Sequence, residues 1–401
     1  MFELIPAAAP DAILGISEAF NKDPNPLKVN LSVGVFKDEA GKTPIPEAVK
    51  EAERRLLERE KTKTYLPIDG LAEFCQLTAH LLFGKEHEVV TSKRACTAQT
   101  PGGTGALRVA ADFVRTHLPN ATVWCSIPTW PNHPKIFQAA GLKTKEYAYF
   151  DASQHGVNLD GMLAAIQQMP AGDVICLHAC CHNPTGADLT AAEWKQVADA
   201  VYAQGVLPLL DFAYLGFGEG LTEDAVALHE LARPGVEMLI ASSYSKNFGL
   251  YNERVGALTV VTKNPEIASK VASQVKATIR TNYSNPPSHG GAIVKEILAD
   301  SALRKQWEDE LSAMRNRING MRTLFADTMA QKLPSKDFRF IEKQRGMFSY
   351  TGLTAAQVDV LKERFGVYIV RDGRINVAGI TTTNCGPLCD AIAAAIKATE
   401  G

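Results

Sequence analysis

Lys246 stands in a stretch that combines a lysine with hydroxyl groups and a second cation. The stretch, SYSKNFGLYNER at 243–254, continues the apolar run MLIASS, places Ser243 and Ser245 before the lysine and places Arg254 after it. Hydroxyl groups and an arginine at the mouth of a strand suit a phosphate. A lysine desolvated near other cations has a lowered pKa and can form a Schiff base. The stretch therefore predicts a nucleophilic amine beside a phosphate site.

Three other segments end apolar runs in a similar way. Asp211 interrupts the apolar run VLPLLDF, and Tyr214 follows three residues later. A buried carboxylate needs a partner, so Asp211 either caps a neighbouring loop or stays ionised to pair with a buried cation. Asn183, in HNPTG, precedes a proline and has an extended backbone that leaves its amide free for a ligand, although NPTG can be only a turn. The loop TPGGTGALRVA at 100–110 can bind an anion at the start of a helix or be only a tight turn.

These residue types together match the needs of one cofactor. A carboxylate facing a pyridinium, a Schiff-base lysine and a phosphate cup are what pyridoxal 5'-phosphate requires. No single segment decides this, but their occurrence on successive strand ends favours it.

The elements that must position these residues alternate along the chain. Apolar runs predict strands, and the segment between two of them predicts a helix that opens with Thr190 and Glu193 in capping-box spacing and ends at Gly205. Such alternation indicates an α/β fold with a mostly parallel sheet covered by helices on both faces. Ligands of such sheets bind beyond the carboxyl ends of the strands. The predicted strands are 122–127, 173–179, 206–212, 238–243 and 255–261.

The last quarter of the chain has a different pattern. Apolar residues recur at steps of three and four from Leu303 to Leu333, which predicts one long helix that leads into a second domain. FSYTGL and VYIV read as strands, a turn at Asp372–Gly373 leads into RINVAG, and a last helix begins near Pro387.

Composition excludes several classes of protein. The 401 residues carry a net charge of -2, which favours neither nucleic acid nor an anionic membrane. No apolar run is long enough to span a membrane, and the N-terminus does not read as a secretory signal, so we expect a cytoplasmic protein. The eight cysteines form no CxxC pair and read as free buried thiols. His178, Cys180, Cys181 and His182 cluster, but adjacent cysteines point to opposite faces of a strand, so we expect no metal site.

The motifs resemble one family over nearly the whole chain. SYSKNFGLYNERVG, HNPTG, DFAYLGF, TPGGTGAL, SNPP and GRINVAG resemble the aspartate aminotransferase family, the class I branch of the fold-type I pyridoxal-phosphate enzymes, and the matches run in the family's order from about Ile13 to Gly379. The resemblance implies an N-terminal arm at 1–12, a small domain at 13–44 and 314–401 built from both chain ends, and a large cofactor-binding domain at 45–313.

The resemblance also implies roles for particular residues. Lys246 would hold pyridoxal phosphate as a Schiff base and later move the substrate's α proton. Asp211 would pair with the pyridine nitrogen and His133 would lie behind it, while Trp130 would stack on the ring and Asn183 and Tyr214 would bond the ring oxygen. The phosphate would be held by Gly103, Thr104, Ser243, Ser245 and Arg254, with Tyr65 from the partner of a homodimer.

Two arginines would bind the substrate's carboxylates. Arg374 would clamp the α-carboxylate, helped by Asn183, Trp130 and the Gly34 backbone. Arg280 is either an ordinary exposed arginine at a helix end or, by resemblance, the residue that reaches across the dimer to a side-chain carboxylate. Facing arginines would select dicarboxylic amino acids and 2-oxo acids, so the predicted reaction is ping-pong transfer of the amino group of aspartate to 2-oxoglutarate.

Alternatives remain at the level of substrate and class. Val35, Lys37, Thr43, Thr104 and Asn285 look like the aspartate-preferring bacterial members, whereas Thr64 and Phe36 depart from them. Because of Thr64, transamination of aromatic amino acids remains a second predicted activity. A nicotinamide dehydrogenase would leave Lys246 and Asp211 unexplained and lacks GxGxxG. A transcription regulator on an aminotransferase domain would need an added DNA-binding module, for which we expect no room.

Overall fold

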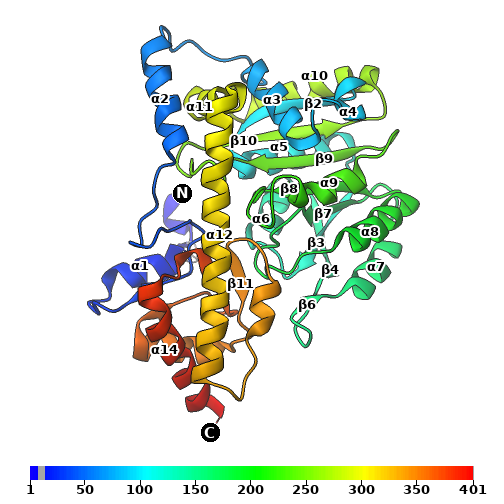
Figure 1. Cartoon of the computed structure of the whole chain (residues 1–401). Helices are drawn as coiled ribbons and strands as arrows, with labels where there is room; N and C mark the ends of the chain where they lie inside the picture. The colour runs from blue at the N-terminus through cyan, green and yellow to red at the C-terminus, as the bar shows by residue number, and fades with distance from the viewer. Residues whose placement is uncertain (8–13, 401) are drawn as a thin grey trace. The chain divides into compact units, whose positions relative to one another are not determined.

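The chain folds into two compact units. The computed structural model describes residues 1–7 and 14–400 (Figure 1). The larger unit comprises 44–183 and 187–316, and the smaller unit comprises 1–43, 184–186 and 317–401. The predicted boundary between the arm and the small domain, at 12/13, lies outside the described residues. The other predicted domain bounds stay a prediction.

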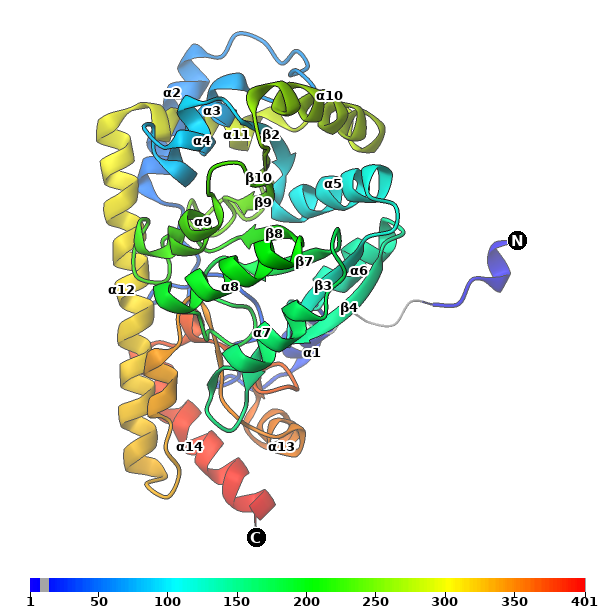
Figure 2. The ribbon, with the colours of Figure 1, turned by 90° about the vertical axis from the view of Figure 1, so that its right-hand side faces the viewer.

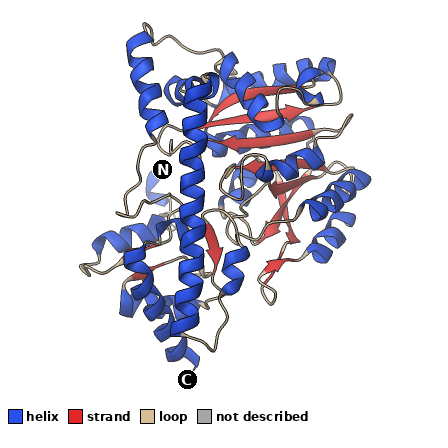
Figure 3. Cartoon of the chain, viewed as in Figure 1, coloured by secondary structure: helices blue, strands red, loops and turns tan. Residues whose placement is uncertain are grey.

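A seven-stranded sheet forms the centre of the larger unit. Its order is β2-β10-β9-β8-β7-β3-β4, and only β10 runs antiparallel to its two neighbours, so the predicted mostly parallel α/β sheet is confirmed (Figure 3). The strands are β2 (Ala95–Pro101), β3 (Thr122–Ile127), β4 (Lys143–Ala148), β7 (Val174–His178), β8 (Leu207–Phe212), β9 (Met238–Ser243) and β10 (Val255–Val261).

The register of the sheet brings the chemically interesting strand ends to one edge. Pro101 of β2 pairs with Val255 of β10, and Ser243 of β9 pairs with Gly256. Asp211 of β8 pairs with His178 of β7. The carboxyl ends of β2, β9, β8 and β7 therefore meet along one edge, where a ligand of a parallel sheet is expected.

Helices cover both faces of this sheet (Figure 2). One layer contains α5 (Gly102–His117), α6 (Asn132–Ala139) and α10 (Pro265–Asn282), and the other contains α3 (Ala72–Phe83), α7 (Leu159–Gln167), α8 (Ala191–Gln204), α9 (Val226–Leu231) and α11 (Ser288–Ala299). The same unit holds α2 (Glu47–Arg59), α4 (Glu88–Thr91), η2 (Glu223–Ala225) and the short ribbon β5 (Phe150–Asp151) with β6 (Gly156–Val157). The α5 layer buries Ala106, Leu107 and Val114 against the sheet, which forms the main core.

The smaller unit has short strands and its own helices. Its strand pairs are β1 (Val29–Asn30) with β12 (Val367–Tyr368) and β11 (Phe348–Tyr350) with β13 (Arg374–Asn376). Its helices are η1 (Phe2–Leu4), α1 (Leu14–Lys22), η3 (Arg339–Lys343), α13 (Ala355–Phe365), η4 (Val377–Gly379) and α14 (Thr382–Glu400). The long helix α12 (Ser301–Lys332) contributes 301–316 to the larger unit and 317–332 to the smaller.

Most of the expected elements are confirmed. β3, β9 and β10 have the predicted bounds, β7 and β8 differ by a residue at their ends, and α8 has the capping box at Thr190 with Gly205 as its left-handed C-cap. α12 begins two residues before the predicted helix. Five strands were not expected: β2 and β4 of the central sheet and the two-residue strands β1, β5 and β6.

The C-terminal helix begins earlier than expected. α14 begins at Thr382 rather than near Pro387, which lies inside the helix. The Glu39 carboxylate accepts the backbone N–H and the hydroxyl of Thr382, so it caps this helix start from a distant part of the sequence. The turn expected at Asp372–Gly373 is present before β13, since the Gly373 N–H donates to the Val370 carbonyl at 2.9 Å. The strands on either side of it have other partners, because β12 pairs with β1 and β13 pairs with β11.

Candidate active site

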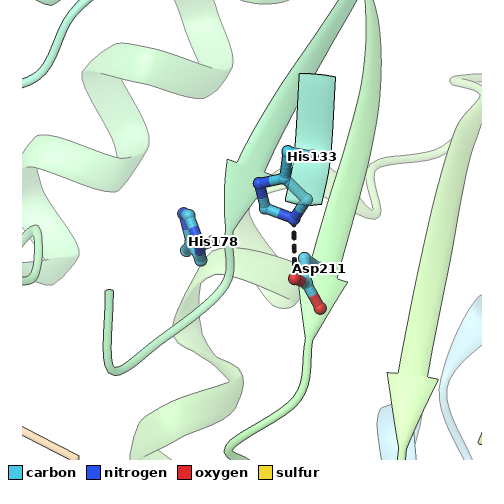
Figure 4. Close-up of side chains that lie close together, drawn as sticks. All are labelled: His133, His178 and Asp211. Carbon is cyan, nitrogen blue, oxygen red and sulfur yellow. Dashed lines mark hydrogen bonds and ion pairs between the residues drawn. The ribbon is translucent and has the colours of Figure 1, made fainter. Parts of the chain in front are cut away.

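Asp211 and His133 form a buried pair at the end of β8 (Figure 4). The Nε2 of His133 donates to Asp211 Oδ2 at 2.8 Å, and the hydroxyl of Thr129 lies 2.8 Å from His133 Nδ1. His133 is fully buried and Asp211 is 7% exposed. The ring of His178 lies 4.9 Å from that of His133. The imidazole thus fixes one carboxylate oxygen in a place that water hardly reaches.

The pair keeps Asp211 ionised. Burial raises the pKa of this carboxyl, but the hydrogen bond and charge of His133, with a smaller effect from Lys246, lower it more, so the pKa lies below its ordinary value. Burial also holds the pKa of His178 well below its ordinary value, so this neighbouring imidazole is neutral. The sheet edge therefore presents a buried anion that can pair with a cationic ring nitrogen.

Lys246 follows the end of β9 and lies close to Tyr214. Its Nζ is 4.9 Å from the centre of the Tyr214 ring. Burial lowers the pKa of this amine, the charge of Asp211 raises it and the charge of Arg254 lowers it further, and the net direction is downward. A lowered pKa increases the neutral fraction, which is the nucleophilic and basic form.

The residues predicted to hold a phosphate, which we name the anion-binding cup, lie at the start of α5 and in the stretch around Lys246. Gly102 has φ +75°, and a Cβ on it would lie 2.6 Å from Arg254 Nη2, so glycine is required there. Ser243 and Ser245 are buried, and their hydroxyls lie 3.2 Å apart. Arg254 Nη1 donates to Ser245 Oγ at 3.4 Å. With Gly103 and Thr104 in the first turn of α5, the cup combines hydroxyls, a guanidinium and helix N–H groups.

Trp130 and Asn183, which are predicted to contact the cofactor ring, lie on the loops after the neighbouring strands β3 and β7. The partly buried ring of Trp130 meets that of His133 edge-on at 5.3 Å. Asn183 is 5% exposed and follows a bend in which Cys181 has φ +53°. Asp188 fixes this bend, because its carboxylate accepts the N–H of Cys181 at 2.6 Å and that of His182 at 2.8 Å.

Two predicted residues of the larger unit point to solvent within the single chain. Tyr65 is 91% exposed. Arg280 is exposed in the last turn of α10, where it donates to the hydroxyl of Ser284. The turn that carries Ser284 is tied to β2, because the Tyr283 hydroxyl donates to the Gln99 carbonyl at 3.2 Å. These two side chains are thus available to a second molecule.

The smaller unit holds Arg374 and Gly34 in a group of their own. Arg374 is 3% exposed, donates to the Ser32 carbonyl at 2.7 Å and stacks on Phe348, with 4.3 Å from its guanidinium carbon to the ring centre. A Cβ on Gly34 would lie 2.5 Å from the same ring. The phenylalanine therefore orients the guanidinium and requires a glycine at position 34.

Sequence reasoning missed the residues that hold the site loops. Asp188 holds the loop of Asn183, Asp224 accepts four N–H groups of the loop after Tyr214, and Asn247 donates to the Leu215 carbonyl at 3.3 Å. These residues act through backbone groups of other segments, so the only signal in the sequence is an aspartate a few residues from a glycine-rich turn.

Among the residues that the structure describes, two groups of side chains have the types that bind metals. They are His133 with His178 and Asp211, and Cys180 with Cys181 and Asp224. In the first group a hydrogen bond joins His133 to the carboxylate, and in the second the backbone already surrounds the carboxylate. All eight cysteines lie among the described residues as thiols outside any disulfide, and six of them are buried.

The fold and the site together define an α/β transferase of fold type I. The chain belongs to the family "Aminotransferase class I and II", whose model matches residues 26–392. It is 54% identical over 396 residues to an aspartate aminotransferase of Salmonella typhi, covering 99% of this chain and all of the relative. It is 45% identical over 395 residues to an aromatic-amino-acid aminotransferase of Escherichia coli, covering 98% and 100% of the two chains.

A solved structure has the same fold. The crystal structure of an aromatic-amino-acid aminotransferase from Burkholderia pseudomallei, covalently bound to pyridoxal phosphate, superposes with a TM-score of 0.97 at 48% identity and covers 98% of this chain and 99% of that one. None of the helices in the described part of the chain is long and apolar enough to cross a membrane.

Proposed function

We propose that this protein is a pyridoxal-phosphate-dependent aminotransferase that reversibly converts L-aspartate and 2-oxoglutarate to oxaloacetate and L-glutamate. The observation that carries the proposal is the placement of Lys246, Asp211 and the anion-binding cup along one sheet edge. The identity to aspartate aminotransferases over the whole chain supports the choice of substrate.

The residues present fit the cofactor. The Asp211 carboxylate, held ionised by His133, would oppose the pyridine nitrogen, and the cup around Ser245 and Arg254 would hold the phosphate. Gly102 lets the Arg254 guanidinium come close to the start of α5, because a Cβ there would lie 2.6 Å from Arg254 Nη2. When bound, pyridoxal phosphate supplies an electron sink for the negative charge that develops at the substrate's α carbon.

The chain's own groups would handle the proton. Burial lowers the pKa of Lys246, so its Nζ is available as the covalent anchor and as the base that takes the proton from the substrate's α carbon. Tyr214 lies against this amine and would hold it in place. Asn183 and Trp130 would orient the cofactor, and Arg374 would bind the α-carboxylate by a bidentate pair with its planar guanidinium.

Two copies of the chain would share their sites. In this proposal the exposed Tyr65 reaches the partner's phosphate, and the exposed Arg280 reaches the side-chain carboxylate of the partner's substrate. A homodimer in the cytoplasm, acting on dicarboxylic amino acids and 2-oxo acids, is the assembly we propose.

Aromatic amino acids are the second candidate substrates. Thr64 differs from the asparagine expected beside Tyr65 in aspartate-preferring members, and relatives named aromatic aminotransferases are 45% and 48% identical to this chain. In this alternative, tyrosine or phenylalanine would donate the amino group to 2-oxoglutarate.

A substrate panel tests both candidates. The kcat/KM values of aspartate, phenylalanine and tyrosine are measured with 2-oxoglutarate as acceptor, for the wild type and Arg280→Leu. We expect aspartate to be preferred, and Arg280→Leu to lower its kcat/KM by roughly 10²-fold while phenylalanine changes little, because a charge-assisted pair is lost for aspartate alone. Arg115→Leu, at the last turn of α5, is the matched control and should change neither. Equal losses on both substrates would show that Arg280 does not recognise the side-chain carboxylate.

A further inference from the structure

The loop that follows Tyr214 wraps around a single buried carboxylate. Asp224 is 5% exposed, and no ion pair of Asp224 is found among the described residues. Burial raises the pKa of this carboxyl, and four backbone N–H donors offset part of that effect: Gly216 at 2.8 Å, Gly218 at 2.9 Å, Glu219 at 2.8 Å and Gly220 at 3.4 Å. Converging backbone N–H groups stabilise an anion without a cation.

Glycines make this close wrapping possible. Gly216 has φ +91°, and a Cβ on it would lie 2.4 Å from the Leu311 side chain. A Cβ on Gly218 would lie 2.4 Å from Asp224 Oδ1. The close approach of the segment to the carboxylate therefore depends on glycine at these positions, and a methyl group at position 218 would push the two apart.

The wrapped loop is joined directly to the pair of Tyr214 and Lys246. The Tyr214 carbonyl accepts the N–H of Phe217 at 3.0 Å, within the wrapped segment. The next carbonyl, of Leu215, accepts from the side chain of Asn247, the residue after Lys246. Arg315 donates to the Gly216 carbonyl at 3.0 Å. The backbone that follows Tyr214 is thus held by hydrogen bonds, one of them from the residue next to Lys246.

We propose that Asp224 is a positioning residue for Tyr214, which it holds against Lys246 through the loop 215–220. This inference rests on the proposed function, in which the phenol bonds the cofactor's ring oxygen beside the amine. Asp224 touches neither substrate nor cofactor and acts through the backbone. The same arrangement accounts for the proximity of Cys180, Cys181 and Asp224 without a metal, because four N–H groups directed at the carboxylate disfavour a cation.

The consequence is a specific optical change. The absorption band of the bound cofactor changes with pH, and a phenol that donates to the cofactor's ring oxygen shifts the midpoint of that change, which we call the optical midpoint. If Asp224 positions that phenol, Asp224→Asn moves the optical midpoint in the same direction as Tyr214→Phe, by about one pH unit at most. In the Tyr214→Phe background Asp224→Asn moves it little further, because the group it acts through is gone.

The experiment titrates the absorption of the holoenzyme for the wild type, both single variants and the double variant. Asp173→Asn is the matched control, since Asp173 is also 5% exposed and accepts from the Thr122 N–H and the Trp124 indole at the opposite end of β7. We expect its midpoint to equal the wild type. If Asp224→Asn does not fold, Gly218→Ala displaces the same carboxylate without removing its charge.

Two results would overturn the inference. One is a lowered melting temperature of Asp224→Asn or Gly218→Ala with an unmoved optical midpoint, which would make Asp224 only structural. The other is a full additional shift in the double variant. A wild-type protein that takes up no pyridoxal phosphate would instead contradict the proposed function, so the two failures are distinguishable.

Discussion

Asp211→Ala tests the electrostatic part of the mechanism. The Asp211 carboxylate is 7% exposed, bonded by His133 at 2.8 Å and ionised, because its pKa is lowered despite burial. Removing one partner of a buried charge pair costs about 3–5 kcal/mol. At 1.36 kcal/mol per tenfold change in rate, this corresponds to a loss of roughly 10²- to 10⁴-fold in the half-reaction with aspartate.

The assay separates chemistry from cofactor binding. Single turnovers with aspartate are followed at saturating pyridoxal phosphate, and cofactor retention is measured by equilibrium dialysis. The anion-binding cup around Ser245 and Arg254 is left intact in Asp211→Ala, so the cofactor should still be retained. We therefore expect a large fall in rate with a much smaller fall in affinity for the cofactor.

Asp173→Ala is the control for burial alone. Asp173 is another buried, hydrogen-bonded carboxylate, but it precedes β7 rather than ending a strand at the site. We expect Asp173→Ala to lower stability with little effect on the half-reaction. Near-normal turnover in Asp211→Ala, or equal losses in the two variants, would refute the electrostatic argument.

Two further predictions concern the anion-binding cup and the dependence of stability on pH. Gly102→Ala should weaken retention of pyridoxal phosphate about tenfold or more in dialysis, because its Cβ would lie 2.6 Å from Arg254 Nη2 at φ +75°; unchanged retention would show that the cup does not hold the phosphate. Burial lowers the pKa values of His87 and His229 in the fold, so the unfolded chain binds more protons below about pH 6.5 and the free energy of unfolding should fall as the pH drops. His87→Asn retains a side-chain acceptor for the Val89 N–H at the start of α4. In urea titrations at pH 5.5 and 7.5, this variant should show a smaller fall in the free energy of unfolding than the wild type. An unaltered pH dependence would show that His87 does not contribute to the fall.

The sequence predicts the central strands well because they are apolar. β9 and β10 are buried along their whole length, so continuous apolar runs mark their bounds. β4 is an edge strand with mostly polar, exposed residues, and β2 carries buried polar residues. Gln99 of β2 donates to the Pro287 carbonyl, and Thr97 bonds Thr259 of β10. Partners so distant in sequence give no local signal.

The residues with chemical roles in the site are easier to predict than the residues that hold the loops of the site in place. Lys246 and Asp211 stand out because charged residues at the ends of apolar runs need a reason. Asp188 and Asp224 look like ordinary loop aspartates, and their partners are backbone N–H groups that converge only after folding. The roles of Tyr65, Arg280 and Arg374 come from family resemblance and stay predictions.

The most direct test of the central claim is borohydride trapping at Lys246. The purified wild type should absorb near the visible edge, and reduction should bleach it and fix pyridoxal phosphate covalently to the peptide that contains Lys246. In Lys246→Ala the same treatment should leave no covalent adduct, and transamination should be almost abolished. A colourless wild-type protein, or a Lys246→Ala variant with unchanged activity, would contradict the account.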